Sequence, residues 1–167
     1  VYEQYPDLIF ASVVAIEAAD LARQQCKALY IVFTGHKSPQ ILLKMLAYGY
    51  PWDAVLMRLN ILDGSFQSFE KWVLPVLVKR NIAALAMKTR ASGAILGAGV
   101  ATAEECWRYV AALPVATIVS GMDSVEILRK NLALAKTLSP MTTAESAAIR
   151  QRTREVALTG KLERFKT

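Results

Sequence analysis

Short apolar segments alternate with longer amphipathic segments along the chain. The short segments are apolar at nearly every position, which is typical of strands covered on both faces. They are Leu29–Thr34, Ala54–Leu59, Ile82–Met87 and Val115–Ser120. Regular alternation of such strands with helices predicts an α/β fold with a parallel sheet. An open doubly wound sheet and a barrel, or a piece of one, both fit this pattern.

Helix starts are recognisable around the strands because N-terminal caps have local sequence patterns. These starts are Ser38 followed by Pro39, Thr102 with Glu105, Asp123 with Glu126, and Thr142 with Glu145. Two further segments, Ser12–Lys27 and Phe69–Arg80, are also expected to be helical. Pro75 should kink the second of these or mark its first turn.

The loop after the fourth strand, Thr117–Glu126, has the pattern of a phosphate-binding turn. It runs from a β-branched strand through Gly121 to a capped helix start, and such an arrangement presents backbone N–H groups to an anion. Asn131 lies two turns into the helix and falls on the same side as Ser124. We expect a nucleotide here, while an ordinary strand-to-helix turn has the same local pattern.

Polar residues gather in all the loops that follow strands. The clusters are Thr34–His36, then Asn60 with Asp63, then Lys88, Arg90 and Ser92, and finally Ser120–Ser124. In both candidate architectures the carboxyl ends of the strands carry the ligand, so one edge of the sheet should collect the four clusters. The run Gly97–Thr102 has two glycines of a dinucleotide fingerprint, but it lacks the third and lies too far beyond its strand.

Composition indicates a single globular domain. The chain has 167 residues, of which 54% are hydrophobic and 20% charged, so it can bury a core. No apolar run approaches the ~18 residues needed to span a bilayer, and no secretory signal pattern is present, so we expect a cytoplasmic protein without a membrane partner. Cys26 and Cys106 are expected to be buried thiols in a reducing compartment. A single histidine and the absence of a close cysteine pair argue against a metal site.

The net charge of +6 raises the question of an acidic partner such as nucleic acid. Much of the excess lies in residues 140–167, where we expect a terminal helix followed by a basic tail. The basic residues of that segment are Arg150, Arg152, Arg154, Lys161, Arg164 and Lys166. Because Phe165 is the one aromatic residue among them, a solvated segment explains the pattern better than a nucleic-acid surface does.

Several ordered motifs resemble the aldo/keto reductase family. They are Tyr30–Pro39, Leu59–Asn60, Ala86–Lys88, and Gly121–Ser124 with Glu126, Leu128 and Asn131. The likeness is to bacterial members that carry a Phe-Thr-Gly-His-Lys-x-Pro segment, and it continues to Phe165–Thr167. The family fold is a parallel (β/α)8 TIM barrel. The resemblance therefore implies that residues 1–167 are a single partial domain that supplies strands five to eight with their helices.

Members of this family reduce aldehydes or ketones with a hydride from a nicotinamide, assisted by a tyrosine, a lysine, an aspartate and a histidine. The resemblance places all four in the first half of the barrel, so we assign no catalytic residue to this chain. Because the sequence starts at Val1 and lacks the four, we expect a fragment that is inactive alone. Its expected partners are the N-terminal half of the barrel, a small carbonyl substrate and, through unpaired strand edges, other copies of itself.

The resemblance also implies part of a cofactor site. Thr34 and Gly35 match the position that holds the nicotinamide carboxamide, where the family often has Ser-Asn, and Leu56 stands where many members have a glutamine. Met87 replaces a tyrosine that commonly stacks on the ring. The full set of expected cofactor-binding residues is Thr34, Gly35, Asn60, Met87, Lys88, Arg90, Ser92, Gly121, Met122, Asp123, Ser124 and Asn131.

Within this set the phosphates and the adenosine have separate expected contacts. Lys88, Arg90 and Ser92 match the loop that wraps the pyrophosphate, and Asn131 matches an asparagine that reaches the adenine. Gly121 and Ile127 stand where the family often places a lysine and an arginine on the 2′-phosphate. We expect NADP(H), on the family habit, with NAD(H) as the alternative. The competing functional hypothesis is a non-catalytic half-barrel that acts as a nucleotide-binding or assembly module.

Overall fold

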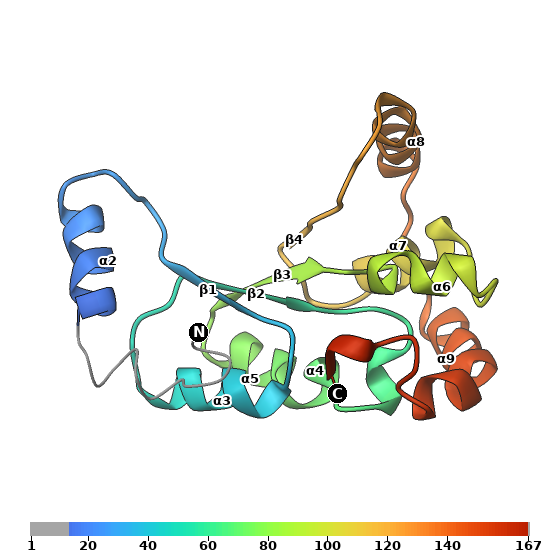
Figure 1. The fold of residues 1–167 in the computed structure, drawn as a ribbon, viewed down its shortest axis with the longest axis horizontal. Helices are drawn as coiled ribbons and strands as arrows, with labels where there is room; N and C mark the ends of the chain where they lie inside the picture. The colour runs from blue at the N-terminus through green and yellow to red at the C-terminus, as the bar shows by residue number, and fades with distance from the viewer. Residues whose placement is uncertain (1–13, 167) are drawn as a thin grey trace.

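The computed structural model describes residues 14–166 and has an α/β fold with one parallel sheet (Figure 1). The four strands are β1 (Val32–Gly35), β2 (Ala54–Arg58), β3 (Ala83–Met87) and β4 (Thr117–Ile118). They lie in the order β1-β2-β3-β4, and every neighbouring pair is parallel. The predicted fold class is confirmed, and all four strands occur within the predicted segments or one residue beyond them.

In residues 14–166 one helix precedes the first strand, five lie between strands and two follow the last strand. They are α2 (Val14–Gln24), α3 (Pro39–Ala47), α4 (Phe69–Trp72), α5 (Leu74–Lys79), α6 (Ala94–Gly97), α7 (Ala103–Ala111), α8 (Val125–Lys136) and α9 (Thr143–Leu158). Three single 3-10 turns are η1 (Asp63–Ser65), η2 (Ala91–Gly93) and η3 (Arg164–Lys166). The first residues of the predicted segment Ser12–Lys27 fall outside the described residues.

Most predicted helix starts are confirmed. Ser38 caps α3 by accepting from the Gln40 backbone N–H, and Pro39 is in the first turn. Both α7 and α9 begin with the complete capping box that the sequence predicts. The predicted helix is interrupted at Val73, and Pro75 lies in the first turn of α5, where its missing N–H costs nothing.

One predicted cap is wrong. The N-cap of α8 is Ser124, whose hydroxyl accepts from the Ile127 N–H at 3.2 Å, so the helix starts one residue later than a cap at Asp123 requires. Glu126 therefore does not reach back to a cap and instead pairs with Lys130 one turn along the helix, at 2.6 Å. Two neighbouring residues were both suitable caps, and the path of the loop selects between them.

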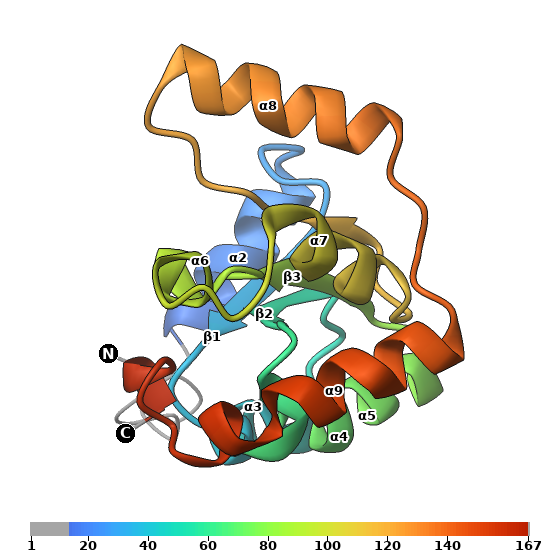
Figure 2. The same ribbon diagram turned by 90° about the vertical axis from the view of Figure 1, so that its right-hand side faces the viewer.

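The core lies between the sheet and the helices on one side of it. Figures 1 and 2 show α3, α4, α5 and α9 on this side. Leu42 and Met45 of α3 belong to the same buried apolar cluster as the sheet residues Val55 and Met57. Burial of such side chains contributes about 1.5–3 kcal/mol each, so this layer supplies much of the stability.

The other face of the sheet is less covered, which corrects the prediction of strands buried on both faces. Along β1, Phe33 and Gly35 are buried while Val32 and Thr34 are exposed, with Val32 43% exposed. In the register, Thr34 lies beside Leu56 and Leu56 lies beside Leu85, so these side chains share the open face. Among the described strands, β1 and β4 each have one unpaired edge.

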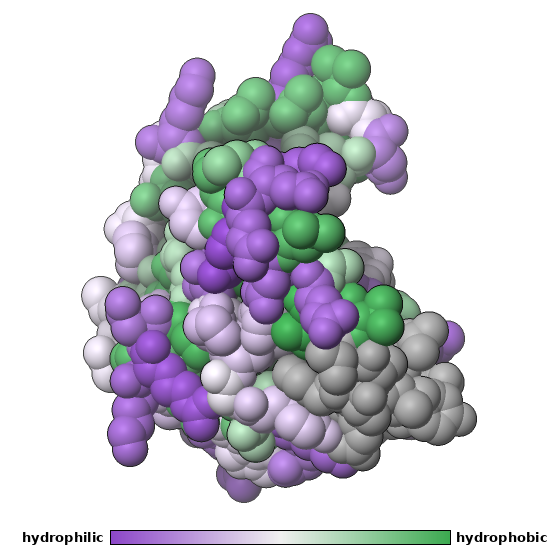
Figure 3. All heavy atoms as spheres, turned by 90° about the vertical axis from the view of Figure 1, so that its left-hand side faces the viewer, coloured by the Kyte–Doolittle hydropathy of each residue, from purple (hydrophilic) through white to green (hydrophobic). Residues whose placement is uncertain are grey.

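Helix α8 lies on the opposite side from α3, α4 and α5, at the top of Figures 1 and 2. Its one buried residue is Asn131, while Val125 and Leu132 are 63% and 52% exposed. Apolar residues accordingly gather along the upper end of the molecule in Figure 3. The helix has an amphipathic sequence, but its apolar side has little of the described chain to pack against.

Two further predictions concern burial. Cys106 is buried as predicted, whereas Cys26 is exposed in the turn that follows α2. The tail is not simply solvated, since Lys166 is buried. Among residues 14–166 there is no helix long and apolar enough to cross a membrane.

Candidate cofactor site

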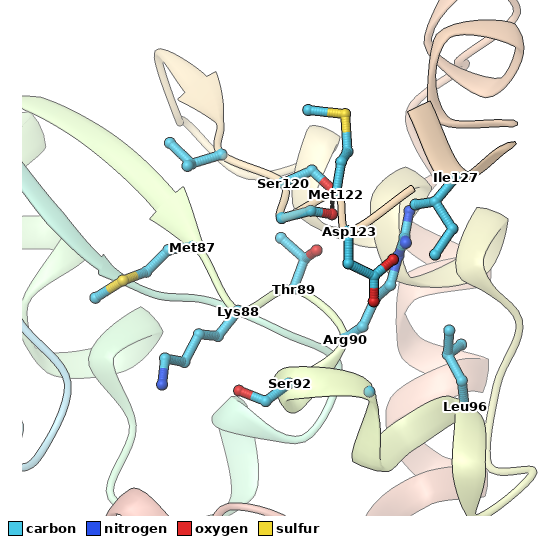
Figure 4. Close-up of a pocket in the computed structure, with 13 residues that line it drawn as sticks. Met87, Lys88, Thr89, Arg90, Ser92, Leu96, Ser120, Met122, Asp123 and Ile127 are labelled. Atoms are coloured by element: carbon cyan, nitrogen blue, oxygen red, sulfur yellow. Dashed lines mark hydrogen bonds between the residues drawn. The ribbon is translucent and has the colours of Figure 1, made fainter. Parts of the chain in front are cut away.

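A pocket of about 590 Å³ opens at the carboxyl ends of β3 and β4 (Figure 4). It lies between the loop that follows β3 and the loop that leads from β4 to α8. Its lining residues are Met87, Lys88, Thr89, Arg90, Ser92, Gly93, Leu96, Val119, Ser120, Gly121, Met122, Asp123 and Ile127. The location agrees with the expectation that ligands of parallel sheets bind beyond the carboxyl ends of the strands.

The loop after β3 has an unusual backbone. Lys88, Ala91, Ser92 and Gly93 all have positive φ, with values of 52°, 48°, 57° and 89°. The turn is closed by a hydrogen bond from the Ala91 N–H to the Lys88 carbonyl at 2.8 Å. Because Ala91, Ser92 and Gly93 are consecutive, the loop does not have the alternating right- and left-handed backbone of an anion-binding nest. Holding several non-glycine residues at positive φ is costly, so the conformation points to a role for this loop.

Arg90 is the best-defined cation of the pocket. Its guanidinium carbon lies 4.9 Å from the centroid of the Trp107 ring, and its Nη2 donates to Asn131 Oδ1 at 2.8 Å. Its Nε is buried and has no hydrogen-bond partner in residues 14–166. Burial lowers the pKa of this guanidinium, but an arginine of ordinary pKa above 12 stays charged at neutral pH. A partly desolvated cation that lines a pocket is suited to a bound anion.

Lys88 provides the second cation. Its Nζ lies 3.7 Å from the centroid of the Phe165 ring, a cation–π contact that joins the β3 loop to the C-terminal tail. The guanidinium carbon of Arg58 lies 5.6 Å from the same centroid, and the ring of His36 packs edge-on at 6.1 Å. The Phe165 ring is therefore in contact with two cationic side chains and one aromatic side chain, which come from the ends of β1, β2 and β3.

The loop after β4 forms the opposite wall. Asn131 donates from Nδ2 to the Ser120 hydroxyl at 3.2 Å while its Oδ1 accepts from Arg90. The amide thus connects α8 to both loops at once, which explains why it is the buried residue of the helix. Gly121 has open space where a side chain would stand, so the backbone there is accessible from the pocket.

Seven of the predicted cofactor residues line this pocket: Met87, Lys88, Arg90, Ser92, Gly121, Met122 and Asp123. Ser124 and Asn131 adjoin it as the helix cap and the connecting amide. Thr34 and Gly35 lie at the end of β1, outside the pocket. Asn60 is fully buried, accepts from the Leu62 N–H at 2.8 Å and donates to Glu163 at 3.0 Å.

Sequence reasoning missed four lining residues: Thr89, Gly93, Leu96 and Val119. Two others, Ser120 and Ile127, were outside the expected cofactor set, but the sequence placed Ser120 in a polar cluster after its strand and the resemblance placed Ile127 near the 2′-phosphate. Leu96 lacked such a signal, because an apolar residue in a short helix usually belongs to the core. Its place in the pocket depends on the packing of α6 beside the loops.

A buried charge cluster lies beside these strand ends and fixes the tail. Lys166 Nζ donates to Asp63 Oδ1 at 2.8 Å and to Glu163 Oε2 at 2.9 Å. Arg58 Nη2 donates to Glu163 Oε1 at 3.0 Å. Burial raises the pKa of Asp63 even though the Lys166 ammonium opposes the shift. The cluster holds η3, and with it Phe165, against the carboxyl ends of the strands.

No model of a known protein family matches the sequence, and no curated protein matches it. The fold is similar to a solved structure, the holo form of aldo-keto reductase AKR11C1 from Bacillus halodurans, with a TM-score of 0.65 and 18% sequence identity. That alignment covers 82% of this chain and 54% of the reductase. The apo form of the same protein gives a TM-score of 0.64 at 18% identity, with 82% and 55% covered. The chain thus has the fold of about half of an aldo-keto reductase chain.

Proposed function

We propose that this chain carries the cofactor-binding half of an NAD(P)H-dependent oxidoreductase of the aldo-keto reductase type, which in complete form reduces aldehydes or ketones to alcohols. The observation that carries the proposal is the pocket at the ends of β3 and β4. It combines two cationic side chains, Lys88 and Arg90, with a loop of positive φ. The similarity to an aldo-keto reductase structure supports the class of enzyme.

The residues present suit a dinucleotide. The pocket volume of about 590 Å³ is within the range of ligand sites, roughly 300–1,000 Å³. The Arg90 guanidinium lines the pocket, where it could donate a charge-assisted hydrogen bond to a phosphate oxygen. Lys88, Arg90 and Ser92 would hold the diphosphate, while Ser120 and the start of α8 would face the adenosine ribose.

The bound nicotinamide would supply the hydride, and the described residues would orient it. Met87 ends β3 next to the pocket, and across the sheet it lies beside Arg58. Its flexible thioether side chain suits packing against the face of a ring. By the resemblance, proton transfer to the carbonyl oxygen belongs to the N-terminal half of the barrel, so this chain contributes binding and orientation.

Titration of the 167-residue chain with NADH and NADPH, followed by nucleotide fluorescence, tests the proposal. We expect binding, no carbonyl-dependent oxidation by this chain alone, and affinity about 10- to 100-fold lower for Arg90→Ala, because a charge-assisted hydrogen bond contributes about 1.5–3 kcal/mol. Arg90→Lys should retain part of the affinity. Arg154→Ala, at an exposed position of α9, is the matched control and should bind as the parent does.

Two results would contradict the proposal. One is the lack of binding of either nucleotide at millimolar concentration by a chain that circular dichroism shows to be folded. The other is equal binding by the parent and Arg90→Ala. Binding by this chain, with no oxidation even when it is joined to an N-terminal half-barrel that carries the four catalytic residues, would favour the non-catalytic module.

A further inference from the structure

We infer that the pocket selects NAD(H) over NADP(H), and that Asp123 sets this preference. The inference rests on the proposed function and deepens it, since it names the cofactor form that the site would take. It also departs from the NADP(H) expectation that the family resemblance gives. The argument comes from how charge is distributed along the pocket.

The basic and acidic residues of the pocket come from different loops, although the Arg90 side chain reaches across to Asn131 of α8. Lys88 and Arg90 stand on the loop after β3, whereas Asp123 stands on the loop that leads into α8, and Figure 4 shows its side chain in the pocket beside Met122 and Ile127. Lys88 and Arg90 are the two basic residues of the lining and Asp123 is the one acidic residue. A diphosphate of two negative charges would use both cations.

A 2′-phosphate would then have no cation of the pocket to meet. It adds about −1.5 to −2 charge at neutral pH. Lys130 is close in sequence but lies outside the lining, is exposed, and pairs with Glu126 at 2.6 Å. Arg129 is also outside the lining. Helix α8 therefore brings its basic side chains to other surfaces.

Asp123 acts on the ribose in two ways. Its carboxylate offers two acceptor oxygens, which suit the two hydroxyl groups of an unphosphorylated ribose, as acidic residues do in NAD-binding proteins of other folds. The same carboxylate repels a 2′-phosphate. No ion pair of Asp123 occurs among residues 14–166.

The test measures the dissociation constants of NADH and NADPH for the parent chain, for Asp123→Asn and for the control Glu155→Gln. Glu155 is an exposed acid of α9 that lies outside the pocket lining. We expect the parent to bind NADH at least tenfold more tightly than NADPH. Asp123→Asn should bring the two constants within about threefold, mainly by improving NADPH binding, and Glu155→Gln should keep the parental ratio.

Equal or tighter binding of NADPH by the parent would overturn the inference while leaving the proposed function intact. A ratio that is the same in Asp123→Asn and the parent would exclude Asp123 as its cause. Failure of both nucleotides to bind the folded chain would overturn the proposed function, and the inference with it. Circular dichroism of each variant separates these outcomes from a loss of folding.

Discussion

Replacing Lys166 by methionine should strongly destabilise the fold. Methionine has nearly the length of lysine and fills the same space, but it carries no charge and donates no hydrogen bond. The Lys166 side chain is fully buried, and its Nζ donates to Asp63 at 2.8 Å, to the Phe66 carbonyl at 2.7 Å and to Glu163 at 2.9 Å. The substitution would leave two buried carboxylates without this cation.

The size of the effect follows from that burial. Removing one partner of a buried ion pair costs about 3–5 kcal/mol, since the remaining charge stays desolvated. Domains have a free energy of unfolding of roughly 5–15 kcal/mol, so Lys166→Met should remove a large part of the total. Arg58 still reaches Glu163, so Asp63 is the carboxylate most affected.

The loss should depend on pH in a definite direction. Burial raises the pKa of Asp63 in the folded state, and the Lys166 ammonium is the largest influence that lowers it. Without Lys166 the folded-state pKa rises further above the unfolded value. Protonation of Asp63 then favours the folded state as the pH falls, so the destabilisation is greatest above the folded-state pKa and smaller below it.

Urea unfolding followed by circular dichroism at pH 8 and at pH 5.5 measures both effects. Lys161→Met is the matched control, because Lys161 is an exposed lysine of the same tail, and its effect should stay within about 0.5 kcal/mol. A loss below about 1 kcal/mol at pH 8 for Lys166→Met would refute the reasoning. So would a loss that grows as the pH is lowered.

Three further outcomes are expected. Gly160→Ala should lower the free energy of unfolding in urea by roughly 1–3 kcal/mol, because Gly160 has φ of 65° and a Cβ there would stand 3.0 Å from the Phe66 ring. Gly97→Ala is the control and should leave the stability unchanged, because a Cβ at Gly97 meets open space. Ellman's reagent should modify one thiol in the native chain and two in urea, because Cys26 is exposed while burial raises the pKa of the Cys106 thiol to about 12. Rapid reaction of both thiols in the native chain would contradict this. Light scattering should give a mass that exceeds the 18.4 kDa of one chain and increases with protein concentration, because β1 and β4 have unpaired edges. A monomer at all concentrations would exclude association through these edges.

Local features of the fold were predictable from the sequence. The caps at Ser38, Thr102 and Thr142 are correct because each is a hydrogen bond within three residues of the chain. The four strands are found because apolar, β-branched segments of that length pack best in a sheet. The predicted strands are longer than the observed ones, most of all for β4, where pairing with β3 is limited to Thr117 and Ile118.

The candidate site was predictable in part. Residues that follow β3 and β4 were expected at one edge of the sheet, and the pocket brings most of them together. The positive φ values of Lys88 and Ser92 carried no sequence signal, because left-handed backbone favours glycine and these are other residues. The double role of Asn131 was also missed, since its partners Arg90 and Ser120 lie in different loops.

The sequence by itself determined the element types, their order and most of the helix caps, because these depend on contacts between residues a few positions apart. Tertiary structure decided which charges are buried and which apolar surfaces stay open. Lys166 looked like a solvated tail residue, yet its partner Asp63 lies 103 positions away in the chain. Val32 looked like a core residue, yet it is exposed because no described element packs over that face of β1. Burial is a property of the assembled layers, and only the folded chain brings those layers together.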